Sequence, residues 1–479
     1  MAEYELHIGM EVHAELLTAS KMFCGCSTHF GAPPNTNVCP VCTGLPGSLP
    51  VPNRRAIEMV VRAALALNCE VSSPSVFQRK NYFYPDLPKA YQISQYGNDP
   101  IGRNGHLDFM VEGKPKRVRI NRVHLEEDTG KLFHVAGGES EVDYNRSGVP
   151  LMEIVTEFPP DIRTPEEARE YLVALRAILV ALEVCDGRME QGSLRCEPNI
   201  SARPVGATGF GKKVELKNLN SFRSVYRGCA YELQRQSALY EAGGTVLQET
   251  RRWDDVRGET FVMRSKELEQ EYRYFPDPDL VPLLFDATWV EDQREALPEL
   301  PQARRARFIS DFGLPEEDAA LLVSDQAMAD FFETTCTDAA DPKAVSNWMT
   351  GDLIRLLSDA KIEIGDSKLA PTHLSHMLSM LDSGAISGKI AKTVFQEMFN
   401  TGKTPEEVVE EQGLTQISDE GAIVAAVDQV LAANPKEVER FQAGEEKLLA
   451  FFVGQLMKAT RGKANPELAN RLLKERLSG

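Results

Sequence analysis

The sequence predicts an α+β protein in which one large domain built on strands is followed by two helical domains. Alternating apolar and polar residues recur through the first part of the chain, as in strands with one buried face. From about residue 291 these runs thin out and helical patterns follow one another, and a capping-box pattern opens a last helical segment at Thr404. We therefore expect domains at residues 1–290, 291–403 and 404–479.

The first domain contains one clear helix among its strands. Residues 164–184 carry apolar residues at helical spacing, and Thr164 can act as N-cap with Pro165 at the first position and Glu167 completing a capping box. Strands are predicted where apolar and polar residues alternate. These segments are residues 116–128, 149–158, 199–206, 212–220 and 259–265.

The helical part begins near residues 297–313 and 315–335, and its last segment has segregated charge. There, Thr404, Pro405 and Glu407 repeat the capping-box pattern after a break at Gly402. Residues 404–446 carry eleven acidic against two basic residues, a charge of −9, and residues 447–479 carry seven basic against two acidic residues, a charge of +5. The basic end is either a solvated helix face or a surface for nucleic acid.

The overall charge limits the kinds of partner. A net charge of −18 argues against broad, nonspecific nucleic-acid binding, which depends on neutralising phosphates with Lys and Arg, so any such contact is expected to be local. The N-terminal residues lack the basic and apolar regions of a signal peptide, and no window approaches the roughly 18 apolar residues that span a bilayer. We expect a cytoplasmic protein with no membrane partner.

Four cysteines lie close together in a loop rich in Gly, Pro, Asn and Thr. Cys24 and Cys26 are separated from Cys39 and Cys42 by twelve residues. The candidates are zinc, a disulfide pair, a redox Cys-x-x-Cys motif and an iron–sulfur cluster. A reducing compartment disfavours disulfides, and the residues after Cys42 run into Gly and Pro instead of opening a helix. Two short-spaced thiolate pairs favour a closed, structural zinc site.

A polar row on a predicted strand could hold a different cation. In "HIGMEVHAEL", Glu11, His13 and Glu15 point to one face, and residues two apart on a strand lie about 6.6–6.8 Å apart. Carboxylates with one imidazole suit Mg²⁺ or Mn²⁺ better than zinc. The alternative is an edge strand with a solvated acidic face.

More acidic residues follow in two other predicted strands. "RVHLEEDTG" offers His124, Glu126, Glu127 and Asp128, and Glu153 stands among Leu, Met, Ile and Val. A carboxylate in such an apolar run is either exposed by alternation or buried with a partner, because an unpaired buried charge is too costly. A metal ion could be that partner.

Two other segments resemble ligand-binding motifs. "GATGFGKK" (residues 206–213) matches a P-loop only in part, because Lys213 replaces the magnesium-binding Ser or Thr and the following residues resemble a strand, so we interpret it as a turn between strands. Aromatic and basic residues interleave in residues 78–97, which could stack on bases or simply pack a core. No Gly-x-Ser-x-Gly or comparable nucleophile signature for amide hydrolysis is present.

Eight ordered motifs together closely resemble the B subunits of bacterial tRNA-dependent amidotransferases. They are "IGMEVHAEL", "KNYFYPDLPKAYQISQ", "HLEEDTGK", "DYNRSGVPLMEIV", "GSLRCEPNIS", "ELKNLNSF", "YRYFPDPDLVP" and "GQLMKATRGKANP". The resemblance implies an antiparallel-sheet cradle related to glutamine synthetase, followed by a helical domain and a small helical tail that meets tRNA. It also implies a heterotrimer with an amidase A subunit and a small C subunit.

The implied activity uses ATP and Mg²⁺. In this family the B subunit phosphorylates the side-chain carboxylate of Glu-tRNA(Gln), and often of Asp-tRNA(Asn). Ammonia, released from glutamine by the A subunit, then displaces the phosphate and gives Gln-tRNA(Gln) or Asn-tRNA(Asn). Two rival classes are a stand-alone ligase similar to glutamine synthetase and a noncatalytic, zinc-bearing tRNA adaptor.

The resemblance assigns roles to individual residues. The family's magnesium positions fall on His13, Glu127 and Glu153, with Glu11 beside them. Some members lack the four cysteines, which supports structural over catalytic zinc. Glu197 stands where the family more often has Asp, which leaves its role open. In the tail, we expect tRNA contacts from Lys458, Arg461 and Lys463.

Overall fold

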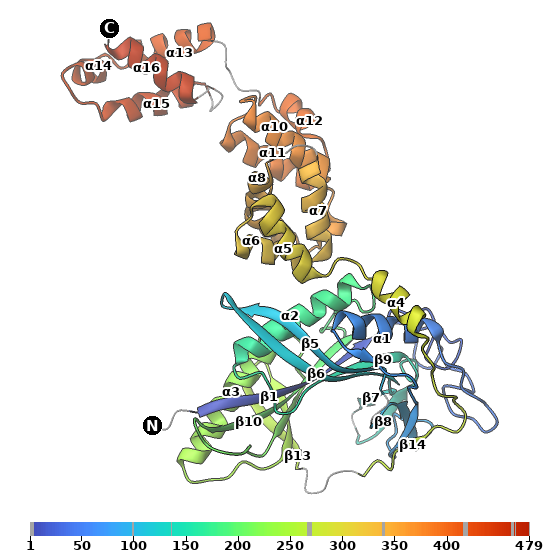
Figure 1. Ribbon diagram of the computed structural model, residues 1–479. Helices are drawn as coiled ribbons and strands as arrows, with labels where there is room; N and C mark the ends of the chain where they lie inside the picture. The colour runs from blue at the N-terminus through green and yellow to red at the C-terminus, as the bar shows by residue number, and fades with distance from the viewer. Residues whose placement is uncertain are drawn as a thin grey trace. The chain divides into compact units, whose positions relative to one another are not determined.

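The computed structural model divides into two compact units, residues 1–304 and 305–479. It describes residues 4–97, 100–135, 137–265, 271–337, 341–414, 420–460, 464 and 466–478. Figure 1 shows strands and three long helices in the first unit and helices alone in the second. The mixed α+β character and the helical C-terminal region that the sequence predicts are therefore confirmed.

The first unit is built on a nine-stranded sheet in the order β13-β12-β11-β10-β1-β9-β6-β5-β2. All neighbouring pairs are antiparallel except β11 and β12, which run parallel. The strands are β1 (Tyr4–Glu15), β2 (Glu70–Val71), β5 (Gly102–Val111), β6 (Lys114–Glu127), β9 (Pro150–Thr156), β10 (Leu194–Pro204), β11 (Val214–Lys217), β12 (Glu249–Asp254) and β13 (Glu259–Ser265).

Strand β1 lies in the middle of this sheet, between β9 and β10, and separates an apolar from a polar face. The side chains of Ile8, Met10 and Val12 are almost completely buried in the core. Glu11 and His13 alternate with them on the opposite face. The alternation predicted for this strand is confirmed, and its polar face belongs to the interior of a large sheet and not to an edge strand.

Helices cover the apolar face of the sheet and leave the polar face for smaller elements. These helices are α1 (Arg54–Ala66), α2 (Pro165–Ala181) and α3 (Phe222–Glu241), which supply much of the same apolar core. A three-stranded sheet, β14-β3-β4, contacts β6, and β7 and β8 form a hairpin. Their bounds are β3 (Gln78–Asn81), β4 (Tyr91–Ser94), β7 (Lys131–His134), β8 (Ser140–Asp143) and β14 (Phe275–Pro276).

The predicted helix starts are present, with one difference in detail. The Thr164 side chain accepts from the Glu167 amide, but the Glu167 carboxylate accepts from the amide of Arg163 instead of that of Thr164. At Thr404 both halves of the capping box form with Glu407. The Gly-rich residues after β10 lead into strand β11, which confirms that they do not form a P-loop.

The end of the first unit packs on its core. Helix α4 (Ala287–Glu295) and the residues after it place Trp289, Leu297 and Leu300 against that core, although the sequence assigned these two leucines to the helical domain. Helix α5 (Pro301–Phe312) follows. Among the described residues, no helix is both long and apolar enough to cross a bilayer.

The second unit contains two apolar cores, the first drawn from residues 308–409 and the second from residues 423–477. Val408 and Val409 of α12 belong to the first core. The helical elements are α6 (Glu316–Val323), α7 (Gln326–Thr337), α8 (Pro342–Asn347), a π-helical turn (Trp348–Leu353), α9 (Ile354–Ala360), a 3-10 turn (Ile364–Asp366), α10 (Pro371–Asp382), α11 (Gly388–Thr401), α12 (Pro405–Glu411), α13 (Glu420–Ala433), α14 (Pro435–Gln442), α15 (Leu448–Ala459) and α16 (Pro466–Ser478).

Candidate active site and metal sites

The polar face of the large sheet brings together an imidazole and two carboxylates. His13 on β1 and Glu153 on β9 are paired across the two strands, and Glu126 comes from β6. The His13 Nε2 atom lies 3.6 Å from Glu153 Oε2 and 3.8 Å from Glu126 Oε1, and one ligand atom from each residue falls within 4.8 Å of the others. We call these three residues the cation cluster.

Two basic side chains from β6 hold the carboxylates of the cation cluster. His124 is paired with Glu153 across the strands, and its Nε2 atom lies 3.0 Å from Glu153 Oε2 and 3.7 Å from Glu126 Oε2. Arg122 Nη2 lies 3.8 Å from Glu153 Oε1. Glu153 therefore stands between two histidines and an arginine, which orient it and balance its charge.

Electrostatics keep the cluster ionised although it is buried. Burial alone would lower the pKa of His13, but the close contact with Glu153 and its charge, with the charge of Glu126, raise it to about 9. Burial would raise the pKa of Glu153, but His124 and His13 hold it well below its usual range. Similarly, burial is outweighed at Glu126, whose pKa is lowered chiefly by the close contact with His124.

This donor set fits a hard divalent cation. Mg²⁺ in proteins is usually bound through one or two carboxylates together with substrate phosphates. The cluster offers two buried carboxylates and an imidazole that can bind once a cation displaces its proton. His124 holds Glu153 at 3.0 Å, and the Ser94 hydroxyl donates to Glu126 at 2.9 Å. The residues present therefore fit the magnesium that the resemblance implies.

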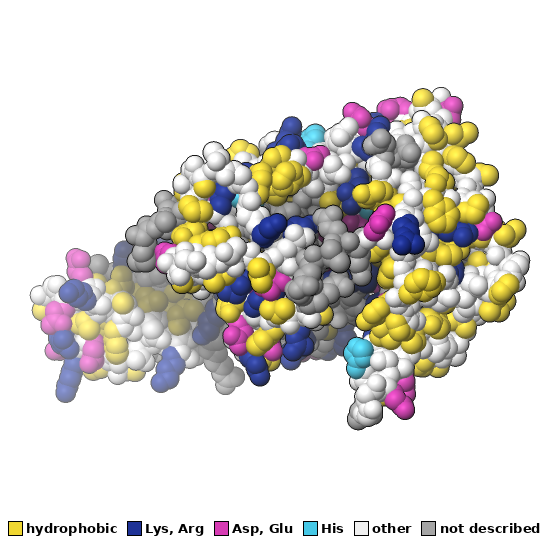
Figure 2. Space-filling model, turned by 90° about the horizontal axis from the view of Figure 1, so that it is seen from below, with side chains coloured by type: hydrophobic (Ala, Val, Ile, Leu, Met, Phe, Trp, Pro, Cys, Tyr) yellow, Lys and Arg dark blue, Asp and Glu magenta, His cyan; other side chains and the backbone are white. Residues whose placement is uncertain are grey.

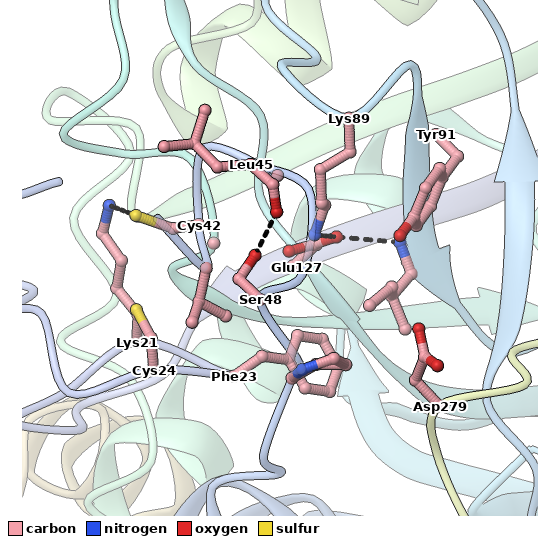
Figure 3. A pocket seen from close by; sticks show the side chains of 15 residues that line it. Lys21, Phe23, Cys24, Cys42, Leu45, Ser48, Lys89, Tyr91, Glu127 and Asp279 are labelled. Atoms are coloured by element: carbon pink, nitrogen blue, oxygen red, sulfur yellow. Dashed lines mark hydrogen bonds and ion pairs between the residues drawn. The ribbon is translucent and has the colours of Figure 1, made fainter. Parts of the chain in front are cut away.

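Glu127, which the sequence assigned to magnesium, faces elsewhere in the structure. Successive side chains of a strand point to opposite faces of the sheet. Because the Glu126 side chain points toward His13, the Glu127 side chain points to the other face. Its carboxylate pairs with Lys89 and accepts from the Ile93 amide at 3.0 Å. Figure 3 shows this pair beside a cavity of about 100 Å³ that also reaches the cysteine loop. Glu127 as a magnesium ligand stays a prediction.

The remaining predicted acids of β1 lie in the same row as His13. Glu11 accepts from Asn199 Nδ2 at 2.9 Å, and burial, together with the charges of Glu153 and Glu197, raises its pKa. Burial and the charge of Asp128 raise the pKa of Glu15 to about 7. Glu197 lies opposite Glu11 across the strands and binds Lys217 Nζ at 2.5 Å.

Sequence reasoning did not place Lys80 near the cluster. Lys80 on β3 places its ammonium 5.0 Å from the Tyr272 ring centre and 5.9 Å from that of Tyr82. Burial would lower the pKa of Lys80, but the charges of Glu126, Tyr274 and Glu153 raise it. Lys80 lies in the interleaved aromatic and basic segment that the sequence marked, but its place beside the cluster could not be seen there, because Tyr272, Tyr274 and the glutamates come from segments far apart in the sequence. The neighbouring Phe83 is 90% exposed and packs no core.

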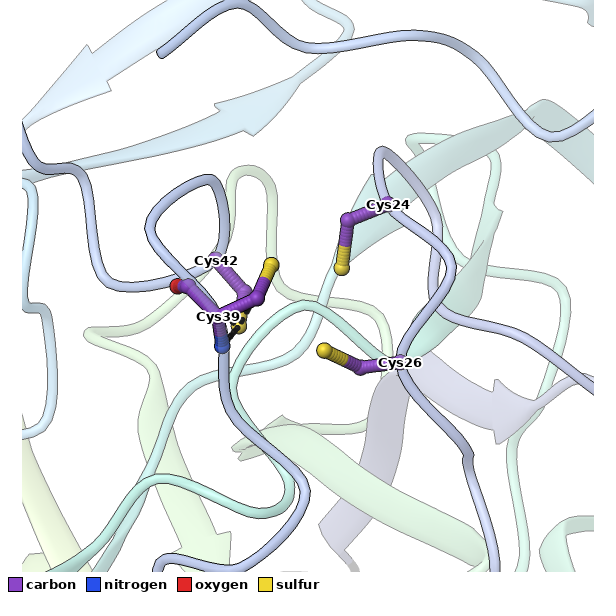
Figure 4. Close-up of side chains that lie close together, drawn as sticks. All are labelled: Cys24, Cys26, Cys39 and Cys42. Atoms are coloured by element: carbon purple, nitrogen blue, oxygen red, sulfur yellow. Dashed lines mark hydrogen bonds between the residues drawn. The ribbon is translucent and has the colours of Figure 1, made fainter.

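The four loop cysteines converge as predicted. Figure 4 shows the Sγ atoms of Cys24 and Cys26 turned toward those of Cys39 and Cys42, and one Sγ from each falls within 4.8 Å of the others. None of the four is in a disulfide. Zn–S bonds of about 2.3 Å place tetrahedral sulfurs about 3.8 Å apart, close to the 3.9 Å between the Cys39 and Cys42 sulfurs. The arrangement fits zinc.

The surroundings of Cys42 favour a thiolate. Its sulfur accepts from the Cys39 amide at 3.2 Å and lies 3.7 Å from Nζ of the buried Lys21. Figure 3 shows Lys21 reaching this sulfur. The contact with the Cys24 thiol, helped by that amide and that lysine, lowers the pKa of Cys42 against the effect of burial. Four of the other cysteines are buried and Cys336 is half-buried, as expected of thiols without a metal role.

The predicted tRNA contacts are described only in part. Lys458 lies in the last turn of α15 and is exposed. Arg461 and Lys463 lie outside the described residues. The space-filling view shows Lys and Arg side chains scattered among hydrophobic ones on the face seen from below (Figure 2).

Comparisons with known proteins cover the whole chain. A family model described as the GatB/GatE catalytic domain matches residues 6–291, and one described as the GatB domain matches residues 330–477. The B subunit of the aspartyl/glutamyl-tRNA(Asn/Gln) amidotransferase of Caldanaerobacter subterraneus subsp. tengcongensis is 56% identical over 476 residues, 99% of this chain and 100% of that protein. The proteins of the same name from Brevibacillus brevis and Solidesulfovibrio magneticus are 55% and 54% identical, each over 100% of both chains.

Proposed function

The chain belongs to the family of aspartyl/glutamyl-tRNA(Asn/Gln) amidotransferase B subunits, and we propose that it carries the ATP-dependent steps of that reaction. A carboxylate oxygen of the tRNA-borne Glu or Asp attacks the γ-phosphorus of ATP, the bond to the β–γ bridging oxygen breaks, and ADP leaves. Ammonia then attacks the carbonyl carbon, phosphate departs with its oxygen, and the nitrogen loses a proton. The products are Gln-tRNA(Gln) and Asn-tRNA(Asn).

The observation that carries this proposal is the cation cluster. The γ-phosphate and the acceptor carboxylate are both anions and repel each other. A magnesium ion held by His13, Glu126 and Glu153 would neutralise phosphate charge beside the acceptor. Glu127 is the sequence-based alternative to Glu126. Because His124 holds Glu153 and the Ser94 hydroxyl donates to Glu126, the ligands are set before substrate arrives.

Two further observations support a division of labour within a larger enzyme. The relatives are named as B subunits, which indicates a multi-subunit assembly. We infer an amidase A subunit and a small C subunit as partners, since no amidase nucleophile signature occurs in this sequence. A cytoplasmic location fits an enzyme that acts on aminoacyl-tRNA. The predicted relation of the sheet domain to glutamine synthetase belongs to the same proposal.

The nitrogen source tests this function and its two rivals. We expect the chain to amidate Glu-tRNA(Gln) with ATP and ammonium chloride, and to use glutamine only when the A and C partners are added. The measurement is the Gln-tRNA(Gln) formed with each nitrogen source, with and without ATP. Efficient use of glutamine by the isolated chain would contradict the division of labour. Amidation of free glutamate would favour the stand-alone ligase, and no ATP dependence in the assembled enzyme would favour the adaptor.

We further propose that the basic end of the tail contacts the tRNA backbone. Reversing one exposed charge by Lys458→Glu should weaken tRNA binding several-fold and reduce the slope of log K against log salt by about 1. The matched control is Lys436→Glu, an equally exposed position in the acidic half of the tail. Binding titrations at several salt concentrations measure both. If the two variants and the intact chain have equal slopes of log K against log salt, this end of the tail is a solvated helix face without a tRNA contact.

A further inference from the structure

Lys21 is a buried cation at the cysteine cluster that the proposed reaction does not use. The residue is only 1% exposed, although lysine is almost never fully buried unless it is paired. Its ammonium lies 3.7 Å from Cys42 Sγ, as Figure 3 shows, and it donates to the Tyr144 carbonyl oxygen at 3.2 Å. A buried ammonium needs a countercharge, because it has lost the water that would otherwise stabilise its charge.

The countercharge available to Lys21 is the thiolate of Cys42. Among the residues that the structure describes, the Lys21 ammonium forms no ion pair with a carboxylate. Glu127 lines the same small cavity, but its carboxylate pairs with Lys89. The Tyr144 carbonyl is a neutral acceptor, so it satisfies a hydrogen bond of the ammonium without balancing its charge. The charge of Lys21 is therefore matched to the sulfur of Cys42.

A zinc ion held by the four thiolates would need such a cation. Four thiolates around Zn²⁺ leave an excess of two negative charges, which is costly where water is excluded. Cys42 is 4% exposed, whereas Cys24, Cys26 and Cys39 are half-buried. The lysine therefore lies against the sulfur that water can solvate least.

The backbone of Lys21 contacts the other half of the cluster. Its amide donates to the Cys26 carbonyl oxygen at 2.9 Å, and its own carbonyl oxygen accepts from Asn53 Nδ2 at 3.3 Å, at the N-cap of α1. One residue thus contacts both thiolate pairs, the first through its backbone and the second through its side chain. The hydrogen bond to Tyr144 joins the cluster to the segment between β8 and β9.

The same segment encloses the stem of the Lys21 side chain. A Cβ at Gly148 would lie 3.5 Å from both Lys21 Cδ and Cys42 Cβ, so the backbone of the segment packs closely on these two residues. The Gly148 carbonyl oxygen accepts from the Met22 amide at 2.7 Å, directly after Lys21. The ammonium is therefore held in one position by its surroundings.

We propose that Lys21 is a positioning residue for zinc in the cysteine cluster. Its ammonium compensates part of the excess negative charge of the four thiolates and holds Cys42 in the orientation of a ligand. Partners of metal ligands typically contribute about 10–100-fold to metal affinity. This inference rests on the predicted zinc site and not on the proposed catalytic function.

Lys21→Met tests the role of the charge, because methionine is a long, flexible side chain without an ammonium. We expect it to weaken zinc binding about tenfold or more, whereas Lys21→Arg, which keeps the charge, should bind zinc within about threefold of the intact chain. The matched control is Lys131→Met, which removes an exposed ammonium from β7 and should change the affinity less than about twofold. Competition with a zinc-binding dye measures the affinity of the full chain.

A cobalt spectrum separates this role from one in packing alone. With Co²⁺ in place of zinc, the sulfur-to-metal charge-transfer band moves to lower energy when a positive charge beside the sulfur is removed. We expect this shift in Lys21→Met and not in Lys21→Arg. Thermal unfolding checks that each variant folds, and Mn²⁺ binding to the cation cluster should be unchanged. If Lys21→Met does not fold, Lys21→Gln, which keeps a hydrogen-bond donor without the charge, takes its place.

Two results would overturn the proposal. One is a Lys21→Met form whose zinc affinity and cobalt spectrum match those of the intact chain. The other is an equal loss of zinc affinity in Lys21→Met and Lys21→Arg, which would show that the size of the side chain matters and its charge does not. An intact chain that binds no zinc would overturn both this inference and the zinc site, and the proposed function would stand.

Discussion

Glu153→Gln is expected to slow phosphoryl transfer from ATP to Glu-tRNA(Gln) by about a hundredfold or more, the scale of losing a preorganised electrostatic contact. Glutamine keeps the size of the side chain but removes the charge that stands between His13 and His124. Phosphate release from ATP in the presence of Glu-tRNA(Gln), measured over a magnesium titration, gives the effect. We expect the decrease in the rate of phosphate release to be largest at limiting magnesium.

The control for this variant is Glu141→Gln, an exposed glutamate on β8 that should leave the rate unchanged. Binding of tRNA should survive in Glu153→Gln, because the proposed tail contact lies in the other unit. Thermal unfolding separates a catalytic effect from loss of the fold. If Glu153→Gln releases phosphate at the same rate as the intact chain at limiting magnesium, the cluster is an acidic patch without catalytic function.

Cys39→Ser is expected to abolish zinc binding and to lower the free energy of unfolding, on the order of several kcal/mol. The loop buries few apolar side chains, since Phe30, Leu49 and Val51 are each more than 60% exposed. Besides the cysteine cluster it is held by polar contacts such as those of Asn35 with β8, which are weaker than a metal cross-link. Metal analysis and denaturant unfolding of the two forms measure both effects. The cation cluster lies on other elements, so magnesium-dependent activity of the folded fraction should persist.

Cys336→Ser is the matched control, because this half-buried thiol lies outside the cysteine cluster. It should retain one zinc per chain and unfold at nearly the same denaturant concentration as the intact protein. Freshly purified intact protein without zinc would show that the four thiols are not a zinc site. Zinc retained by Cys39→Ser with unchanged stability would show that Cys39 is not a ligand.

Local patterns were sufficient to predict features whose residues are close in sequence. The alternation of "GMEVHAEL" placed Glu11 and His13 on one face of β1, and the composition of the cysteine loop predicted the convergence of its four sulfurs. The same alternation, applied to "VHLEED", places His124 and Glu126 on one face and Glu127 on the other. That signal was available, but the family assignment favoured Glu127.

Features that depend on strand pairing across long separations could not be predicted. Lys80 approaches the cation cluster only because β3 pairs with β4, which packs beside β6. A cavity of about 720 Å³ lined by Gly9 exists because β10, β9 and the Gly-rich segment surround one end of β1. In the same way, Leu297 and Leu300 looked like parts of a helical domain until the structure placed them against the core of the sheet.

The most direct test of the central claim is Mn²⁺ binding to the intact chain and to Glu126→Gln and Glu127→Gln, followed by electron paramagnetic resonance in the presence of AMP-PNP. These two neighbouring, buried glutamates face opposite sides of the sheet, so each is the matched control for the other. The cation cluster predicts that Glu126→Gln weakens Mn²⁺ binding by about tenfold or more, while Glu127→Gln binds within about twofold of the intact chain. Weakened binding in Glu127→Gln together with intact binding in Glu126→Gln would contradict it.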